Sequence, residues 1–335
     1  MNILINATAA KEGGAETIVK NFLEHKKNDG NDYYILAPFN NDFNADNFFW
    51  KKKSTSGFYT TLFSVFFVFF YIKLYKCEKI YSFSNVNCFF PVKFKITYFH
   101  NYLILISPGL KFKLLRLTLR FFNQLKASFV FQTDLVSRDF LHVIGNPKSI
   151  LIRWPGVNID MVNFTSNLDT DTDTDTDTDT DTDKKYKFLI PITDLKNKNK
   201  NFELITKIVE SMNANKNVLF YVTANEPLDN DYDERFIFLG KLMPNTFLNT
   251  LKSCDAVIIT SYFETACLPL FEALAFNKVA FVFNRDYVQS FIEMFGNIDG
   301  LIRFDDEKEL LALFEFNKYI HAESEKKFMI GNWEF

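Results

Sequence analysis

Apolar residues in this chain form short runs that alternate with longer stretches of helical spacing. The short runs are rich in Val, Ile, Leu and Phe and lack polar alternation, for example Asn2–Asn6, Ala256–Thr260 and Val279–Phe283. Such runs are typical of strands buried on both faces, as in parallel sheets covered by helices. The longer stretches, for example Ala15–Lys27 and Pro244–Cys254, predict those helices.

The full pattern predicts two similar halves. The strands expected in the first half are Asn2–Asn6, Tyr33–Ala37, Lys79–Ser84, Phe94–Phe99, Ser128–Gln132 and Ser149–Arg153. Those expected in the second half are Lys187–Ile192, Asn217–Thr223, Arg235–Leu239, Ala256–Thr260, Val279–Phe283 and Leu301–Phe304. The expected helices are Ala15–Lys27, Thr60–Lys76, Lys111–Lys126, Asn201–Ala214, Pro244–Cys254 and Pro269–Phe276. This repeated β-α order predicts two tandem, doubly wound α/β domains with Rossmann-like parallel sheets.

An Asp-Thr repeat separates the two halves. Eight Asp residues alternate with Thr over residues 169–183. A uniformly acidic, low-complexity tract cannot bury apolar surface, so we expect a disordered linker. A calcium loop is not supported, because its Gly turn and bidentate Glu are missing. The predicted boundaries are a first domain over 1–155, a linker over 156–186 and a second domain over 187–335.

Composition excludes several protein classes and points to an anionic partner. Apolar residues make up 47% and charged residues 24% of the 335 residues, which excludes wholesale disorder and a fibrous repeat. The net charge of -3 hides a split: residues 1–150 carry 19 basic and 10 acidic side chains, and the remainder carries 19 and 31. A basic first half favours a membrane surface or phosphorylated substrates. No nucleic-acid-binding module is recognisable, so nucleic acid is not an expected partner.

The cysteines and the apolar segments favour a cytoplasmic protein. Four cysteines form no CxxC pair and no metal-ligand spacing, which is typical of a reducing compartment. The first residues lack the pattern of a signal peptide. Residues 54–72 carry no charge, but Ser and Thr dilute their first half, so a buried or surface-seated helix is favoured over a membrane span.

Residues 110–129 combine basic and large apolar side chains. Basic side chains at 111, 113, 116, 120 and 126 alternate with Leu and Phe. Such a basic amphipathic helix is consistent with peripheral attachment to an anionic membrane. An ordinary helix with its basic face in solvent is the alternative.

Three candidate positions follow predicted strands, where ligands bind in open parallel sheets. Gly13 and Gly14 precede a helix and permit close approach of backbone N–H groups to an anion. His100 follows the fourth strand, and a lysine-rich loop at 195–201 follows the first strand of the second half. At these positions a plain turn, a structural histidine and a solvated loop stay open as alternatives.

The most specific motif lies at residues 264–272. A buried strand ends at Thr260, a short loop carries Glu264, and Pro269 starts a helix that carries Glu272. Pro is tolerated in the first turn of a helix. The two carboxylates, eight positions apart, are therefore expected to face one ligand together with the backbone amides between them.

This motif resembles the signature of the group-1 (family 4) retaining glycosyltransferases, which have the GT-B fold. Their pattern, E-x-F-G-L-P-x-x-E, reads E-T-A-C-L-P-L-F-E in this chain. Further segments match in the family's order, namely Gly-Gly-Ala-Glu (13–16), Phe-Gln-Thr (131–133), Pro-Gly-Val-Asn (155–158), Lys-Asn (200–201) and Phe-Leu-Gly-Lys (238–241). The resemblance covers most of the chain and implies two domains that face a central cleft.

The resemblance implies a role for each matching residue. His100 and Glu264 would be the catalytic residues and contact the transferred sugar. The donor-binding residues would be Gly13, Gly14, Lys200, Cys267, Leu268 and Glu272. Lys200 would bind the diphosphate and Glu272 the ribose hydroxyls, with no metal or other cofactor. The implied reaction moves a hexose from a nucleotide sugar to a lipid-linked or oligosaccharide acceptor of a surface glycan, such as lipopolysaccharide or capsule, at the inner face of the plasma membrane.

Two departures from the family pattern leave alternatives open. Ala266 and Cys267 replace the Phe-Gly of the signature, so a side chain stands where the family has Gly. An Arg that commonly follows the first strand of the second domain is replaced within Pro-Ile-Thr-Asp (191–194). A catalytically impaired GT-B protein that acts as a scaffold in glycan assembly, or a GT-B nucleotide-sugar epimerase, would also fit.

Overall fold

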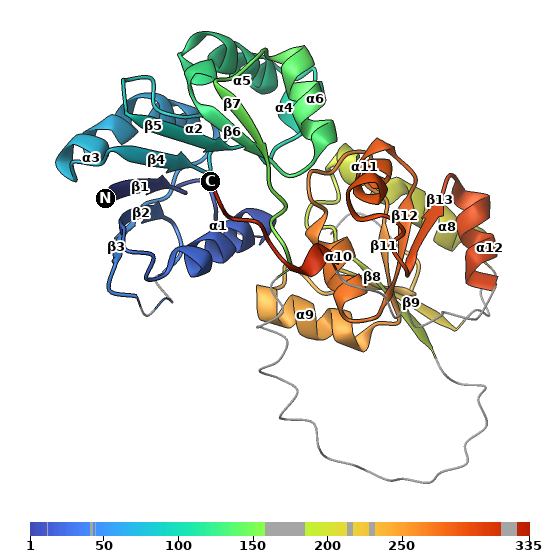
Figure 1. Cartoon of the computed structure of the whole chain (residues 1–335). Coiled ribbons are helices and arrows are strands. Elements are labelled where there is room, and N and C mark those ends of the chain that lie inside the picture. Colours follow the sequence, from blue (N-terminus) through green and yellow to red (C-terminus); the bar gives the residue numbers. More distant parts are fainter. Residues whose placement is uncertain are drawn as a thin grey trace. The chain divides into compact units, whose positions relative to one another are not determined.

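The chain forms two compact units in a computed structural model (Figure 1). The first unit comprises Met1–Gly156 and Ile330–Phe335, and the second comprises Val157–Met329. The structure describes residues 1–11, 13–40, 43, 45–157, 185–212, 217–227, 232–315 and 327–335. The Asp-Thr repeat lies outside the described residues. The sequence assigns residues 330–335 to the second domain, whereas in the structure they belong to the first unit.

The described part of the first unit is built on a seven-stranded parallel sheet. Its strands are β1 (Asn2–Asn6), β2 (Asp32–Ala37), β3 (Phe48–Lys52), β4 (Lys79–Ser82), β5 (Phe94–Tyr98), β6 (Ser128–Phe131) and β7 (Ser149–Ile152). Their spatial order is β3-β2-β1-β4-β5-β6-β7, so the direction of winding reverses between β1 and β4. The helices are α1 (Gly13–Lys26), α2 (Gly57–Leu62), η1 (Phe63–Phe67), α3 (Val68–Leu74), α4 (Leu103–Ile106), α5 (Leu110–Phe121), η2 (Gln124–Lys126) and α6 (Asp134–Val143).

The second unit has a six-stranded parallel sheet in its described part. Its strands are β8 (Tyr186–Ile190), β9 (Val218–Val222), β10 (Phe236–Phe238), β11 (Ala256–Ile259), β12 (Val279–Phe283) and β13 (Leu301–Phe304). The order β10-β9-β8-β11-β12-β13 reverses the winding between β8 and β11. The helices are η3 (Lys198–Lys200), α8 (Phe202–Ser211), α9 (Pro244–Ser253), α10 (Leu268–Ala275), α11 (Asp286–Phe295), α12 (Glu307–Glu315) and η4 (Lys327–Met329). Two doubly wound, Rossmann-like domains are thus confirmed.

Helix α2, the π-helical turn η1 and α3 form one continuous apolar helix on the first sheet. Phe63, Val68 and Ile72 pack with Leu4 of β1 in one core cluster. In the widened turn, the carbonyl of Val65 accepts a hydrogen bond from the backbone N–H of Phe89, outside the helix, at 2.8 Å. One face of this helix therefore belongs to the core, as the sequence favours.

The opposite face of the same helix is apolar and exposed. Phe58, Phe70 and Leu74 are 71%, 67% and 65% exposed. Among the described residues, Gly57–Leu74 is the one helix whose length and composition would suffice to cross a bilayer, with a mean hydropathy of 1.6. Its other face is packed in the core of the first unit, against Leu4 and Leu36 of the sheet.

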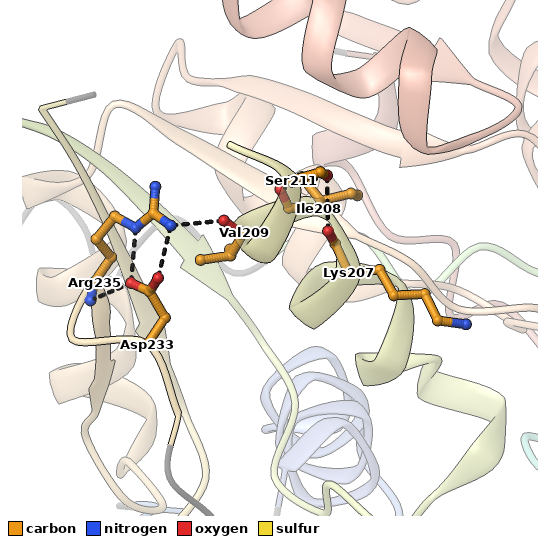
Figure 2. Close-up of polar contacts among 6 residues, drawn as sticks. All are labelled: Lys207, Ile208, Val209, Ser211, Asp233 and Arg235. Carbon is orange, nitrogen blue, oxygen red and sulfur yellow. Dashed lines mark hydrogen bonds and ion pairs between the residues drawn. The ribbon is translucent and has the colours of Figure 1, made fainter. Parts of the chain in front are cut away.

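An ion pair between Arg235 and Asp233 fixes helix α8 to the segment that leads into β10 (Figure 2). The Arg235 guanidinium donates to both carboxylate oxygens of Asp233, each at 2.7 Å, and to the carbonyl of Val209 in α8 at 2.6 Å. Arg235 is 8% exposed. Because the guanidinium satisfies a carbonyl in the last turn of α8, it holds this helix, and the loop that precedes it, in place.

Residues 330–335, which we call the tail segment, pack into the first unit. The backbone N–H of Asn332 donates to the carbonyl of Trp154 at 2.9 Å. The ring centroids of Trp333 and Phe22 lie 6.0 Å apart. A Cβ on Gly331 would come within 2.6 Å of the carbonyl oxygen of Pro155, so only glycine fits at this crossing.

Candidate functional site

The winding reversal of the second sheet brings two loops to the same point. The chain runs outward from β8 to β9 and β10 on one side, and from β11 to β12 and β13 on the other. Ligands of doubly wound sheets bind beyond the carboxyl ends of the strands at such a reversal. The loop after β8 carries Lys200 and the loop after β11 carries Glu264, so the sheet topology itself brings these two predicted residues together.

Asn199 joins the two loops. Its side-chain carbonyl accepts from the N–H of Phe263 at 3.1 Å, and its amide donates to the carbonyl of Phe263 at 2.9 Å. Its backbone carbonyl accepts from the N–H of Tyr262 at 2.9 Å. The Thr260 hydroxyl adds a bond of 2.7 Å to the carbonyl of Lys200. These bonds fix the loop backbones on which Lys200 and Glu264 stand.

Lys200 and Glu264 form an ion pair. The Lys200 Nζ lies 2.6 Å from the Glu264 Oε1, and the side chains are 31% and 17% exposed. Burial opposes the charge of Lys200, but attraction to Glu264 and the hydrogen bond between them outweigh it and raise the pKa of the ammonium. Lys200 is therefore charged at neutral pH, and Glu264 lies where it offsets that positive charge.

Cys267 adopts the conformation for which glycine is usually chosen. Its φ is 46° at the position before Leu268, the first residue of α10. An L-residue with a Cβ is strained in this left-handed region. Cys267 is 6% exposed, and burial, with a further contribution from Glu264, raises the pKa of its thiol. The backbone thus keeps the geometry of a Gly position although a buried, neutral thiol occupies it.

Glu272 lies in the second turn of α10 with an unusual carboxyl group. Burial raises its pKa to about 7. In the part of the chain that the structure describes, no ion pair or hydrogen bond to this carboxylate is found. The negative charges of both Glu264 and Glu272 contribute to the raised pKa of the Cys267 thiol. The two carboxylates therefore border the same loop-helix corner. Because Glu272 receives no hydrogen bond from the described residues, a ligand could supply the missing donors.

The glycine pair lies at the winding reversal of the first sheet. Helix α1 begins at Gly13, whose φ is 60°, in the segment that follows β1. Gly13 and Gly14 are both exposed. The first N–H groups of a helix have no acceptor inside it and carry a partial positive charge. This helix start therefore offers backbone donors to an anionic or hydroxylated ligand.

His100 follows β5, the neighbour of β4 in the first sheet. Its backbone N–H and that of Asn101 donate to the side-chain carbonyl of Asn85 at 2.8 and 3.1 Å. Burial lowers the pKa of the imidazole to about 4. A neutral ring can accept or donate a hydrogen bond to a sugar hydroxyl, but it is not a cation at neutral pH.

The structure therefore places the predicted residues in two groups. Lys200, Glu264, Cys267, Leu268 and Glu272 come together at one corner of the second unit. The predicted residues Gly13, Gly14 and His100 belong to the first unit. Among the described residues, no cluster of three or more His, Cys, Asp or Glu could hold a metal ion.

Sequence reasoning missed the two asparagines that position these residues. Asn85 holds the backbone at His100, and Asn199 holds the backbone beside Glu264. Asn85 has a φ of 63°, and asparagine tolerates that region better than other residues with a side chain. An Asn just beyond a predicted strand was therefore a usable signal.

Comparison with known proteins shows which solved structures have a similar fold. No family model matches the chain, and no curated protein matches it. HepE of Anabaena has a similar structure, with a TM-score of 0.63 at 12% identity over 93% of this chain and 88% of HepE. A glycosyltransferase of Rickettsia africae gives 0.60 at 12% over 94% and 87%, and WaaG, a glycosyltransferase of lipopolysaccharide biosynthesis, gives 0.59 at 13% over 84% and 81%. The two Rossmann-like domains of this chain thus have the GT-B fold of these glycosyltransferase structures.

Proposed function

We propose that this protein is a retaining glycosyltransferase that moves a hexose from a nucleotide sugar to a lipid-linked or oligosaccharide acceptor. One observation carries the proposal: Glu264, paired with Lys200, and Glu272, which has no partner among the described residues, border one corner at the winding reversal of the second sheet. The complexes of HepE with UDP and glucose, and with UDP-glucose, support a nucleotide sugar as the donor.

Glu272 would bind the ribose of the donor. A diol presents two O–H donors, which match a carboxylate that receives no hydrogen bond from the residues the structure describes. Hydrogen bonds to the charged form of Glu272 would lower its pKa below the value of about 7 in the free protein. Nucleotide binding would therefore release a proton below pH 7.

Lys200 and the start of α10 would stabilise the leaving group. The bond between the anomeric carbon and the diphosphate oxygen breaks, and the diphosphate keeps the electron pair. Positive charge on Lys200 and backbone N–H groups at the helix start act where this negative charge develops. Because Lys200 is paired with Glu264 in the free protein, donor binding would let Glu264 turn to the sugar hydroxyls.

Retention would follow from attack on the face that the diphosphate leaves. The acceptor hydroxyl forms the new bond to the anomeric carbon, and its proton passes to the departing diphosphate. His100, neutral at physiological pH, would position a hydroxyl of the transferred sugar without adding charge. None of these steps requires a metal ion or a further cofactor.

The acceptor would be a surface glycan precursor, handled at the cytoplasmic face of a membrane. The role of WaaG in lipopolysaccharide biosynthesis supports this acceptor class. The exposed residues of α5 support membrane contact: Leu110 and Phe121 are 73% and 72% exposed, and Lys111 and Lys113 are exposed between them. Such a face suits an anionic bilayer.

Flotation with liposomes tests the membrane contact. The protein should float with vesicles of phosphatidylcholine and phosphatidylglycerol, and less with phosphatidylcholine alone. The double variant Leu117→Ser, Phe121→Ser should lose this binding, whereas Met243→Ser, an exposed apolar site of the second unit, should keep it. Equal flotation of both variants would contradict this part of the proposal.

A thermal-shift panel of nucleotide sugars tests the proposed activity. A donor that binds the native state raises its stability by about 2.7 kcal/mol at a concentration of 100 times Kd. Glu272→Ala should abolish the shift, and a hexose should appear on the acceptor only with the unaltered chain. A panel in which no nucleotide sugar raises the melting temperature would overturn the proposal.

The side chain of Cys267 is the observation that favours the second candidate, a scaffold without activity. In its left-handed conformation, Cys267 adds a buried thiol where the resemblance has glycine. If the thiol blocks the sugar, donor binding should be absent in the natural chain and restored in Cys267→Gly. Donor binding by the unaltered chain, with turnover, would eliminate the scaffold.

A further inference from the structure

The corner with Lys200 and Glu264 has a third side, formed by the loop after β12. Strand β12 lies next to β11 in the sheet, so its carboxyl end opens at the same edge. Arg285 is the residue before α11 and has extended backbone geometry. Its guanidinium carbon lies 3.6 Å from the ring centroid of Phe283 and 5.6 Å from that of Tyr262.

This stacking connects Arg285 to the proposed donor corner. Tyr262 is bonded through its backbone N–H to the carbonyl of Asn199, the residue before Lys200. Arg285 donates to the carbonyl of Asn284 at 3.1 Å. Within the described ranges, no carboxylate forms an ion pair with Arg285. Its charge is therefore held by aromatic rings and by one neutral carbonyl.

Tyr287, in the first turn of α11, provides an independent observation. It is 3% exposed, and no hydrogen-bond partner for its hydroxyl exists among the described residues. Burial raises the pKa of this hydroxyl, the charges of Cys267 and Glu264 add to the effect, and Arg285 opposes it. The hydroxyl thus lies within electrostatic reach of both Glu264 and Arg285. A buried, unbonded hydroxyl is unfavourable unless a ligand accepts from it.

Charge balance at the corner indicates which ligand fits. The positive charge of Lys200 is offset by Glu264 at 2.6 Å. A sugar nucleotide carries a negatively charged diphosphate, and some sugars add a carboxylate. Arg285 is a nearby cation that forms no ion pair with an acidic residue among the described residues, and the first N–H groups of the ten-residue α11 add a positive helix end. The side chain of Asp286 in that first turn is exposed to solvent.

We propose that Arg285, the Tyr287 hydroxyl and the start of α11 form an oxyanion subsite that binds an acidic group of the donor beside Glu264. This inference rests on the proposed function. The acidic group is either a phosphate of the diphosphate or the carboxylate of an acidic sugar. In both cases the guanidinium and the hydroxyl donate to oxygen atoms with negative charge.

Calorimetric titration of matched variants tests the subsite. The ligands are UDP, UDP-glucose and UDP-glucuronate, with GDP and GDP-mannose for the other base. The variants are Arg285→Gln, which removes the charge, and Tyr287→Phe, which removes only the unbonded hydroxyl. The controls are Arg303→Gln, an exposed arginine of the same unit, and Tyr221→Phe on β9. Loss of a hydrogen bond to a charged group should weaken binding by about tenfold or more.

The pattern of losses identifies the acidic group. Weaker binding of all nucleotides, including the diphosphate without sugar, assigns the subsite to the phosphates. Weaker binding of UDP-glucuronate alone assigns it to a sugar carboxylate. Because Tyr287→Phe breaks no hydrogen bond within the described part of the chain, the melting temperature of this variant should equal or exceed that of the natural chain. This result separates a ligand contact from a structural role.

Two results separate failure of the subsite from failure of the proposed function. If the natural chain binds the nucleotides and both variants bind within twofold of it, the subsite is overturned while the proposed function stands. If the natural chain binds no nucleotide of the panel, the proposed function fails and the subsite with it.

Discussion

Cys267 shows how one residue departs from a pattern while the backbone keeps it. The sequence alone suggests that a side chain in place of glycine crowds the donor. In the structure, the backbone retains a φ of 46°, so the glycine-type geometry survives with a strained cysteine. Replacement of glycine by Cys267 therefore adds a side chain to the corner. The backbone N–H groups at the start of α10 keep the direction that a glycine at position 267 would give them.

Substitution of Cys267 by β-branched valine should expose this strain. Cys267→Val is expected to be about 1 kcal/mol less stable than Cys267→Ala, because a branched Cβ fits the left-handed region poorly. The matched control is the same pair of substitutions, Val and Ala, at Cys254, which is also buried but has a φ of -90°. Urea unfolding should show the Val penalty at position 267 and not at 254. Equal penalties at both positions would mean that Cys267 is unstrained in solution.

Glu272→Gln should stabilise the free protein in a pH-dependent way. The pKa of Glu272 rises from 4.5 to about 7 on folding. Between these values the folded state binds more protons than the unfolded state, so the free energy of unfolding falls as pH rises and levels off above about 7. Glu272→Gln removes this loss and should be about 2 kcal/mol more stable at pH 8, after allowance for partial exposure, with no gain near pH 4.

Denaturant titrations at pH 4 and pH 8 measure this effect, with exposed Glu293→Gln on α11 as the control. The same Glu272→Gln variant should bind nucleotide more weakly. Higher stability combined with weaker binding would identify Glu272 as a residue kept for its ligand. A stability difference that does not change with pH would contradict the raised pKa.

At the scale of elements, the buried strands were the easiest to predict. Continuous apolar runs identified β1 and β12 to the residue, because such strands are covered on both faces. The edge strand β13, which includes the exposed Arg303, was also predicted with its exact bounds. The sequence missed β3, an edge strand that ends in Lys51 and Lys52. Charged residues on an edge strand prevent further pairing, and they also hide the strand from a hydrophobicity pattern.

The attachment of α8 depends on Arg235, which the sequence pattern treated as the start of a strand. Arg235→Ala should lower the free energy of unfolding by about 2 kcal/mol, because Asp233 loses its partner and the carbonyl of Val209 loses its donor. Lys207→Ala on the same helix removes an exposed ion pair with Glu203 and should leave stability unchanged. Urea unfolding compares the two. Equal losses would show that Arg235 contributes no more than a surface charge.

At the scale of the whole molecule, the tail segment belongs to the unit that begins the chain. Trp333 is 5% exposed, and its ring lies 6.0 Å from that of Phe22 and 6.1 Å from that of Tyr98. No local pattern in the last residues indicates these partners, because Phe22 and Tyr98 lie 311 and 235 positions before Trp333 in the chain. The sequence assigned these residues to the second domain because they follow it in the chain. Position along the chain does not determine the domain in which a segment packs.

Removal of the Trp333 side chain should therefore destabilise the first unit. Trp333→Ala is expected to lose about 3 kcal/mol through cavity formation. Ile330→Ala, at an 82% exposed position of the same segment, should have little effect. Hydrogen exchange should accelerate in α1 and β5 in the first variant and not in the second. Unchanged exchange in both would show that the tail segment does not support the first unit.

The sequence by itself determined the alternation of buried strands and helices, and with it the two Rossmann-like domains. It also placed Glu264 and Glu272 on one loop-helix corner, because their spacing is local. Tertiary structure decided which distant residues join them. Lys200 meets Glu264 across 64 positions, because β8 and β11 are neighbours in the sheet. Burial, which depends on every packed neighbour, set the charge states of Glu272 and His100.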